Sequence, residues 1–202
     1  MTSIESITLE VPDATVADAF YAAALGLGAQ VGLRASDGET AGFRAFTLSL
    51  VVSQPANVDE LLGAALDAGA TTLKPAKKGL WGYGGVVRAP DGAIWKVATS
   101  SKKDTGPATR QIDEIVLLLG VADVAASKQF YLDHGLAVTR SFGRKYVEFA
   151  APSTHIKLAL YGRRALAKDA GIGRDGAGSH RIVIGSDAGP FTDPDGFVWE
   201  AV

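Results

Sequence analysis

Two stretches of this sequence are near copies of each other, APDGAIWKVA at Ala89–Ala98 and DPDGFVWEAV at Asp193–Val202. Each begins with a Pro-Asp-Gly turn and continues as a short run of apolar and aromatic residues, which predicts a turn that leads into a strand. Within the strand the charge is reversed, because Lys96 in the first copy stands where Glu200 stands in the second. The repeat therefore raises a functional question, namely why one strand keeps an acid that the other has lost.

A second pair of repeats precedes these two stretches. VPDATVADAFY at Val11–Tyr21 matches VADVAASKQFY at Val121–Tyr131, and both pairs keep the same order along the chain. This pattern indicates a tandem duplication. The segment Thr99–Gln111 between the copies is polar, contains a Gly-Pro pair and has no hydrophobic period, as expected of a linker. We predict a first half at 1–100, a linker at 101–111 and a second half at 112–202.

Each half is expected to begin with a strand followed by a helix. The apolar runs Ile4–Val11 and Ile112–Val121 predict buried strands, and Asp13 and Asp123 are placed to cap the next segments. Glycines at 26 and 135 are placed to end those helices. Further strands are expected at Phe46–Val52, Tyr146–Ala150, His155–Tyr161 and Ser179–Gly185, and a second helix at Val58–Ala70, with either Ala165–Gly171 or nothing as its counterpart. The pattern predicts an α+β fold with mixed sheets.

Composition narrows the class of protein. A chain that is 47% hydrophobic and 21% charged can bury an ordinary globular core. The net charge of −2 gives no basic footprint for nucleic acid. Without cysteine there are no disulfides, thiolate ligands or thiol nucleophiles. No apolar run approaches the ~18 residues of a membrane span. We predict a cytoplasmic protein with no nucleic acid or membrane partner, and a homodimer is an open alternative to a monomer.

The repeated stretches resemble the vicinal oxygen chelate (VOC) superfamily of glyoxalases, bleomycin-resistance proteins and extradiol dioxygenases. VPDATVADAFYAAALGL and VADVAASKQFYLDHGL are similar to the family's first strand and helix, and the two Pro-Asp-Gly stretches are similar to its last strand. The resemblance implies tandem βαβββ modules with mixed, curled sheets that form half-open barrels around a small-molecule site. In metal-using members, the ligands come from the first strand and from a glutamate on the last strand.

In the first half, the places matching these ligands are Ser6 and Lys96. An ammonium group repels a metal cation, so the first half is expected to hold no metal. Trp81 and Tyr83, in the glycine-rich stretch LWGYGG, offer aromatic surface that a ligand can approach closely. We predict a pocket at Ser6, Trp81, Tyr83 and Lys96.

In the second half, the resemblance offers a different set. Glu200 holds the last-strand place, and His180 holds the first-strand place if Ser179–Gly185 opens a shortened module. Glu114 lies two residues before the matching place on the strand at Ile112–Val121 and on the same face. Glu114, His180 and Glu200 are therefore the candidate ligands for one divalent zinc, manganese, nickel or iron ion.

The predicted pocket in the first half and the candidate metal ligands in the second half suggest two alternative functions. The favoured one is a protein that binds a small organic molecule in a cupped sheet without a metal. The alternative is a metal-dependent lyase, isomerase or dioxygenase with a single site in the second half. Motifs typical of nucleotide binding or serine hydrolases are missing from the sequence.

Overall fold

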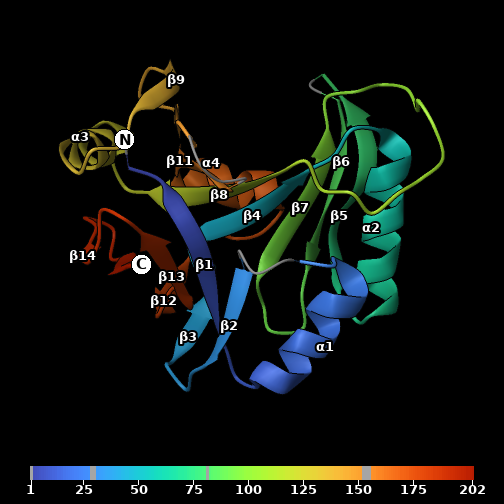
Figure 1. Cartoon of the computed structure of the whole chain (residues 1–202), viewed down its shortest axis with the longest axis horizontal. Coiled ribbons are helices and arrows are strands. Elements are labelled where there is room, and N and C mark those ends of the chain that lie inside the picture. The colour runs from blue at the N-terminus through green and yellow to red at the C-terminus, as the bar shows by residue number, and fades with distance from the viewer. Residues whose placement is uncertain (1, 28–30, 81, 152–155) are drawn as a thin grey trace.

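The computed structural model describes residues 2–27, 31–80, 82–151 and 156–202. The described strands form an eight-stranded sheet in the order β5-β6-β7-β4-β8-β11-β10-β9 and a five-stranded sheet in the order β14-β15-β13-β1-β2. A further pair, β3 (Thr40–Gly42) and β12 (Gly176–Gly178), stands apart from both. Figure 1 shows α1 and α2 at the end of the larger sheet that is formed by β5, β6 and β7.

The eight-stranded sheet contains two complete βαβββ units. The first consists of β4 (Phe46–Val51), α2 (Pro55–Asp67), β5 (Thr71–Gly79), β6 (Gly82–Arg88) and β7 (Ile94–Thr99). The second consists of β8 (Glu114–Val121), α3 (Val124–Asp133), β9 (Val138–Phe142), β10 (Tyr146–Phe149) and β11 (Ile156–Gly162). In each unit the first strand pairs with the last in parallel, and the first strands β4 and β8 pair with each other antiparallel.

The five-stranded sheet repeats this pattern in reduced form. One reduced unit consists of β1 (Ile4–Val11), α1 (Ala14–Ala24) and β2 (Val31–Ala35), and the other consists of β13 (Ile182–Ser186), β14 (Phe191–Thr192) and β15 (Val198–Ala201). Again the first strands β1 and β13 pair antiparallel, and each pairs in parallel with the last strand of its own unit. Each sheet therefore takes strands from both halves of the chain, the larger sheet from its middle and the smaller sheet from its two ends.

The repeated sequence motifs meet in space in both halves. In the first half, the Tyr21 hydroxyl donates to Asp91 (2.7 Å) and accepts from the Trp95 indole (3.2 Å). In the second half, the Tyr131 hydroxyl donates to Asp193 (2.5 Å) and its ring packs against Trp199. Both tryptophans are buried within one continuous core that includes residues of both sheets. The motifs thus connect the first helix of each half to its last strand.

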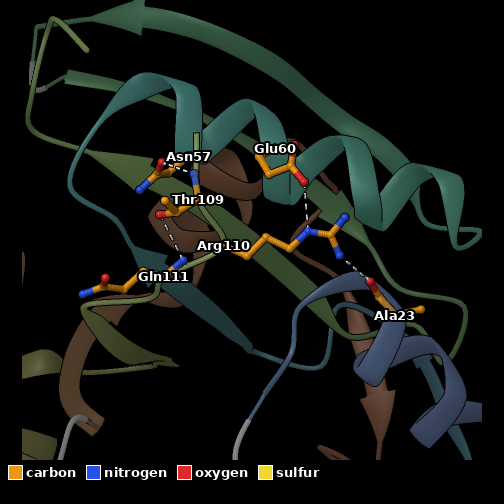
Figure 2. Close-up of polar contacts among 6 residues, drawn as sticks. All are labelled: Ala23, Asn57, Glu60, Thr109, Arg110 and Gln111. Carbon is orange, nitrogen blue, oxygen red and sulfur yellow. Dashed lines mark hydrogen bonds and ion pairs between the residues drawn. The ribbon is translucent and has the colours of Figure 1, made fainter. Parts of the chain in front are cut away.

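The linker is fastened to the helices that it passes (Figure 2). Arg110 donates to Glu60 of α2 and to the carbonyl oxygen of Ala23 of α1, both at 2.9 Å. Asn57 accepts from the backbone of Thr109, and Asp104 accepts from the Ala56 backbone at the start of α2. Because α2 has no side-chain cap of its own, the linker supplies one.

Helix boundaries follow local chemistry closely. Asp13 and Asp123 each accept two backbone N–H groups at the starts of α1 and α3, as predicted. The helix predicted at Val58–Ala70 begins earlier, at Pro55, because proline suits the first helical turn.

Among the described residues, no helix is long and apolar enough to cross a membrane.

The remaining helix, α4 (Arg163–Ala170), directly follows β11 and overlaps the segment Ala165–Gly171 that the sequence offered as a counterpart of α2. α2 follows the first strand of its unit, whereas α4 precedes β13, and β13 reaches β14 through a short turn instead of a helix. In the second complete unit, the place that α2 holds in the first is held by α3.

Candidate functional site

One row of residues crosses the centre of the eight-stranded sheet. Lys96 on β7 pairs with Ser49 on β4, Ser49 pairs with Val116 on β8, and Val116 pairs with Lys157 on β11. Because directly paired residues project to the same side, these four side chains share one face, which we call the α4 face. This cross-sheet row brings the last strands of both complete units to one site.

The helix α4 covers the middle of this face. Leu166, Ala167 and Ala170 are buried and form a small apolar cluster with sheet residues of the same face, including Ile94 and Leu118. Gly120 allows the close approach, since a Cβ there would lie 3.2 Å from Leu166. The opposite face of the sheet carries the main core, including Trp95 and Leu117. α4 therefore occupies space on the face where Lys96 and Lys157 project.

Lys96 forms an ion pair with α4. Its Nζ lies 2.8 Å from Asp169 Oδ2, and the two side chains are 35% and 43% exposed. Lys74 of β5 donates to the carbonyl oxygens of Lys168 (2.7 Å) and Asp169 (2.6 Å) at the end of α4, where the helix dipole favours a cation. Two lysines of the first complete unit thus hold the C-terminal end of α4 against the sheet.

A cavity of about 270 Å³ lies beside this ion pair. Its wall contains Lys74, Lys77, Lys96 and Asp169, together with glycines and small apolar residues of β5, β6 and β7. Among them, Gly84 faces Ala98 of β7 so closely that a Cβ would lie 2.7 Å from the carbonyl oxygen of Val97. The glycines that the sequence assigned to ligand approach therefore also permit close strand pairing.

Of the two aromatic residues predicted for the pocket, Trp81 lies outside the described residues. Tyr83 borders the cavity, but its hydroxyl donates to Asp59 of α2 (2.8 Å) and its side chain packs against the main core. Alternation along β6 places Tyr83 on the α2 side and Val86 on the α4 face. The Tyr83 ring therefore does not project toward Lys96.

At the other end of the cross-sheet row, Lys157 lies between two carboxylates. Its Nζ is 2.8 Å from Glu114 Oε1 and 3.3 Å from Glu148 Oε1, and Tyr146 donates to Glu148 at 2.9 Å. Burial alone lowers the pKa of Lys157, but the hydrogen bond and charge of Glu114 and the charge of Glu148 outweigh it and raise the pKa. The predicted ligand Glu114 thus holds an ammonium group in this structure.

The five-stranded sheet carries the other two strand positions of the sequence analysis. Ser6 of β1 pairs with Gly185 of β13, and Gly185 pairs with Glu200 of β15, so Ser6 and Glu200 share one row. Arg34 of β2 reaches across this row and donates to both oxygens of Glu200, at 3.1 and 2.9 Å. This bidentate hydrogen bond lowers the pKa of Glu200. The sequence analysis assigned Ser6 to the same pocket as Lys96, whereas the structure sets it beside Glu200.

His180 lies just before β13. Its Nδ1 is 2.8 Å from the carbonyl oxygen of Arg44, its Nε2 is 3.1 Å from that of Asp195, and its ring stacks on Phe197. Both ring nitrogens therefore face carbonyl oxygens of the protein.

These contacts decide how well the residues fit a metal ion of the kind used in the resembled family. Glu200 is held by Arg34, Glu114 by Lys157, and His180 by two carbonyl groups. Within the described part of the chain, no three His, Cys, Asp or Glu side chains gather where one ion could be bound. In this arrangement the donors do not fit a common metal site, and the metal hypothesis stays a prediction.

Asp169, Lys157 and Arg34 are the residues that the sequence analysis missed. Each forms an ion pair with a strand residue that is distant from it in sequence. Of the three, only Lys157 lies in a strand that the sequence predicted, at His155–Tyr161.

Comparison with known proteins supports the fold. No family model matches the chain, and no curated protein matches it. Glyoxalase I from Zea mays has a similar structure, with a TM-score of 0.65 at 16% identity, over 100% of this chain and 92% of that one. A putative dioxygenase from Bacillus subtilis subsp. subtilis str. 168 gives a TM-score of 0.56 at 12% identity, over 91% of this chain and 69% of that one.

The chain therefore has a glyoxalase-like α+β fold, as its sequence motifs predicted. At these identities the likeness establishes the fold and leaves the ligand and the chemistry to the residues themselves.

Proposed function

We propose that this protein binds a small organic molecule with an acidic group on the α4 face of the eight-stranded sheet, and that it does so without a metal. The observation that carries the proposal is the cavity beside Lys96, because it lies at the last-strand position of a complete unit. Lys96 is the residue that meets the acidic group.

The charges in the cavity wall favour an anion. Lys74, Lys77 and Lys96 contribute three ammonium groups, against one carboxylate from Asp169. Lys74 is engaged by the carbonyl groups of α4, and Asp169 neutralises Lys96 in part. Lys77 is exposed and adds positive potential at the edge of the cavity.

The cavity also limits the size of the ligand. About 270 Å³ lies just below the lower end of the range typical of small-molecule sites, ~300 to 1,000 Å³. Leu166 and Ala170 of α4 fill the neighbouring space on the same face. A compact aliphatic or aromatic acid suits this volume better than a large cofactor.

Asp169 is the intramolecular competitor of such a ligand. An acidic group that binds Lys96 must share it with Asp169 or displace it, since Asp169 already lies 2.8 Å from Nζ. Removing the charge of Asp169 should therefore strengthen the binding of acids, and removing that of Lys96 should weaken it.

Calorimetric titration with a panel of small carboxylates, including benzoate and oxalate, tests the proposal. We expect Lys96→Gln to weaken the binding of any acid found by about tenfold or more, as loss of a charged hydrogen bond implies. Asp169→Asn should strengthen it, and Lys145→Gln on the exposed turn before β10 is the matched control. Binding unchanged in Lys96→Gln, or no binding by any acid of the panel, would overturn the proposal.

A further inference from the structure

The solvent side of α4 carries a second, separate hollow. Its lining consists of Arg164, Ala167, Lys168, Gly171, Ile172 and Arg174, around a volume of about 560 Å³, and we call it the basic groove. A neighbouring hollow of about 380 Å³ shares Arg164 and Arg174 with it. The two hollows therefore adjoin at these arginines, and neither shares a lining residue with the Lys96 cavity.

The rim of the basic groove carries three cations. Arg164 and Lys168 stand one turn apart on α4, and both are exposed. Within the described chain, neither side chain has an ion-pair partner that offsets this repulsion, and like charges at this spacing destabilise a helix. Arg174 has a contact of 3.7 Å with Asp175, whose side chain is 98% exposed. The positive charge of the rim is therefore largely uncompensated.

The chain geometry holds Arg174 against the helix. Gly171 ends α4 in a left-handed conformation (φ 81°), which turns the chain back beside the helix. Arg163 then fixes the returning segment, because its guanidinium donates to the carbonyl oxygens of Phe43, Arg174 and Gly176. Arg174 thus faces Arg164 and Lys168 from a fixed loop.

The floor of the basic groove is apolar. Ala167 is buried and Ile172 is half-buried, and Ile172 packs against the small apolar cluster under α4. A ligand in the groove would place its charged end on the rim and an apolar part on this floor. Arginine guanidinium groups match carboxylate and phosphate oxygens in a bidentate manner.

We propose that the basic groove binds a small organic oxyanion, a phosphate or carboxylate group on an apolar body. The volume falls in the range of small-molecule sites, ~300 to 1,000 Å³. This site is separate from the Lys96 cavity, and its residues do not include Lys96 or Asp169.

The test is a titration at low ionic strength with phenyl phosphate, benzoate and inorganic phosphate, followed by calorimetry and by amide chemical shifts. Phenyl phosphate should bind more tightly than inorganic phosphate, because only the former covers the apolar floor. Arg164→Gln and Arg174→Gln should each weaken its binding by about tenfold. Arg144→Gln, which removes an equal charge from an exposed turn of β9 and β10, should leave the binding unchanged. Circular dichroism confirms that each variant is folded.

Three results would overturn the proposal. One is equal weakening by Arg144→Gln, which would indicate attraction to net charge alone. Another is the same affinity for phenyl phosphate and inorganic phosphate, which would remove the role of the floor. The third is preference for a short single-stranded oligonucleotide over phenyl phosphate. Arg164→Gln should leave the binding of small acids at the Lys96 cavity unchanged, because Arg164 does not line that cavity, so failure here is distinguishable from failure of the proposed function.

Discussion

The two last-strand positions Lys96 and Glu200 carry opposite charges in opposite surroundings. Lys96 lies on the eight-stranded sheet, beside a helix that covers its face, and pairs with Asp169 of that helix. Glu200 lies on the five-stranded sheet and pairs with Arg34, which reaches it across two intervening strands. In both sheets the charged side chain at the last-strand position is already neutralised by a partner within the protein. The comparison teaches that the role of a charged residue at this strand position depends on its ion-pair partner as well as on its own residue type.

The largest expected effect tests whether the two sheets form one cooperative unit. Trp95 and Trp199 are 0% and 1% exposed and belong to the same core. We expect Trp95→Ala and Trp199→Ala each to lower the free energy of unfolding by about 3 to 5 kcal/mol, through lost burial and a residual cavity. Urea denaturation followed by circular dichroism measures this, with the exposed Phe142→Ala as control. Two separate transitions, one for each tryptophan, would contradict a shared core.

A second prediction compares the two lysines of the cross-sheet row. Lys157→Gln leaves Glu114 and Glu148 facing each other with side chains 31% and 15% exposed, and should cost about 1 to 3 kcal/mol. Lys96→Gln leaves one more exposed carboxylate and should cost less than ~1 kcal/mol. Denaturant midpoints of the two variants test this order. Glu148→Gln added to Lys157→Gln should recover part of the loss, and failure to do so would contradict the repulsion between the carboxylates.

A third prediction concerns the pH dependence of stability and the buried Asp193, which accepts a hydrogen bond from Tyr131 in the second half. Burial raises the pKa of Asp193 above its usual value of 3.8, although hydrogen bonds oppose this. The folded protein therefore binds this proton more tightly than the unfolded chain does. The resulting stability is present below the unfolded pKa and is lost as pH rises through the folded pKa.

Asp193→Asn should remove that loss. The difference in unfolding free energy between the native protein and Asp193→Asn should shift in favour of the variant as pH rises from 3.8. The exposed Asp67→Asn is the control and should not show this trend. A constant difference across the range would show that burial does not shift the acid.

The smallest effect is expected at Glu200. The hydrogen bonds from Arg34 lower its pKa, so the pair contributes stability above the unfolded pKa that is lost as pH falls through the folded one. Because both side chains are nearly half exposed, Glu200→Gln should change the unfolding free energy by less than ~1 kcal/mol, and salt should reduce the difference.

The same variant tests the metal alternative. For a protein that binds its ligand without a metal, zinc, manganese, nickel or iron(II) should change the melting temperature equally in the native protein and in Glu200→Gln. A rise confined to the native protein would instead indicate a bound ion at Glu200, because a ligand stabilises the folded state by mass action.

Much of the fold was predictable because its signals are local. The cap residues Asp13 and Asp123 act within the next turn, and the strand predicted at Ile4–Val11 has the same bounds in the structure. The repeated motifs resemble those of a known family, and this resemblance predicted the glyoxalase-like fold, since the order of the motifs along the chain is a property of the sequence. The place of α4 was not predictable, because the helical spacing of Ala165–Gly171 indicates a helix but does not say which face of which sheet that helix covers.

The candidate site divides in the same way. The repeat by itself singled out Lys96 and Glu200 as charged positions on matching strands, and the family resemblance together with strand alternation added Glu114. Only the tertiary structure decided that Lys96 meets Asp169, that Glu200 meets Arg34 and that Glu114 meets Lys157. The physical reason is that a strand's own sequence determines which side chains share its face, whereas the strands and helices beside it are chosen by burial of the whole core.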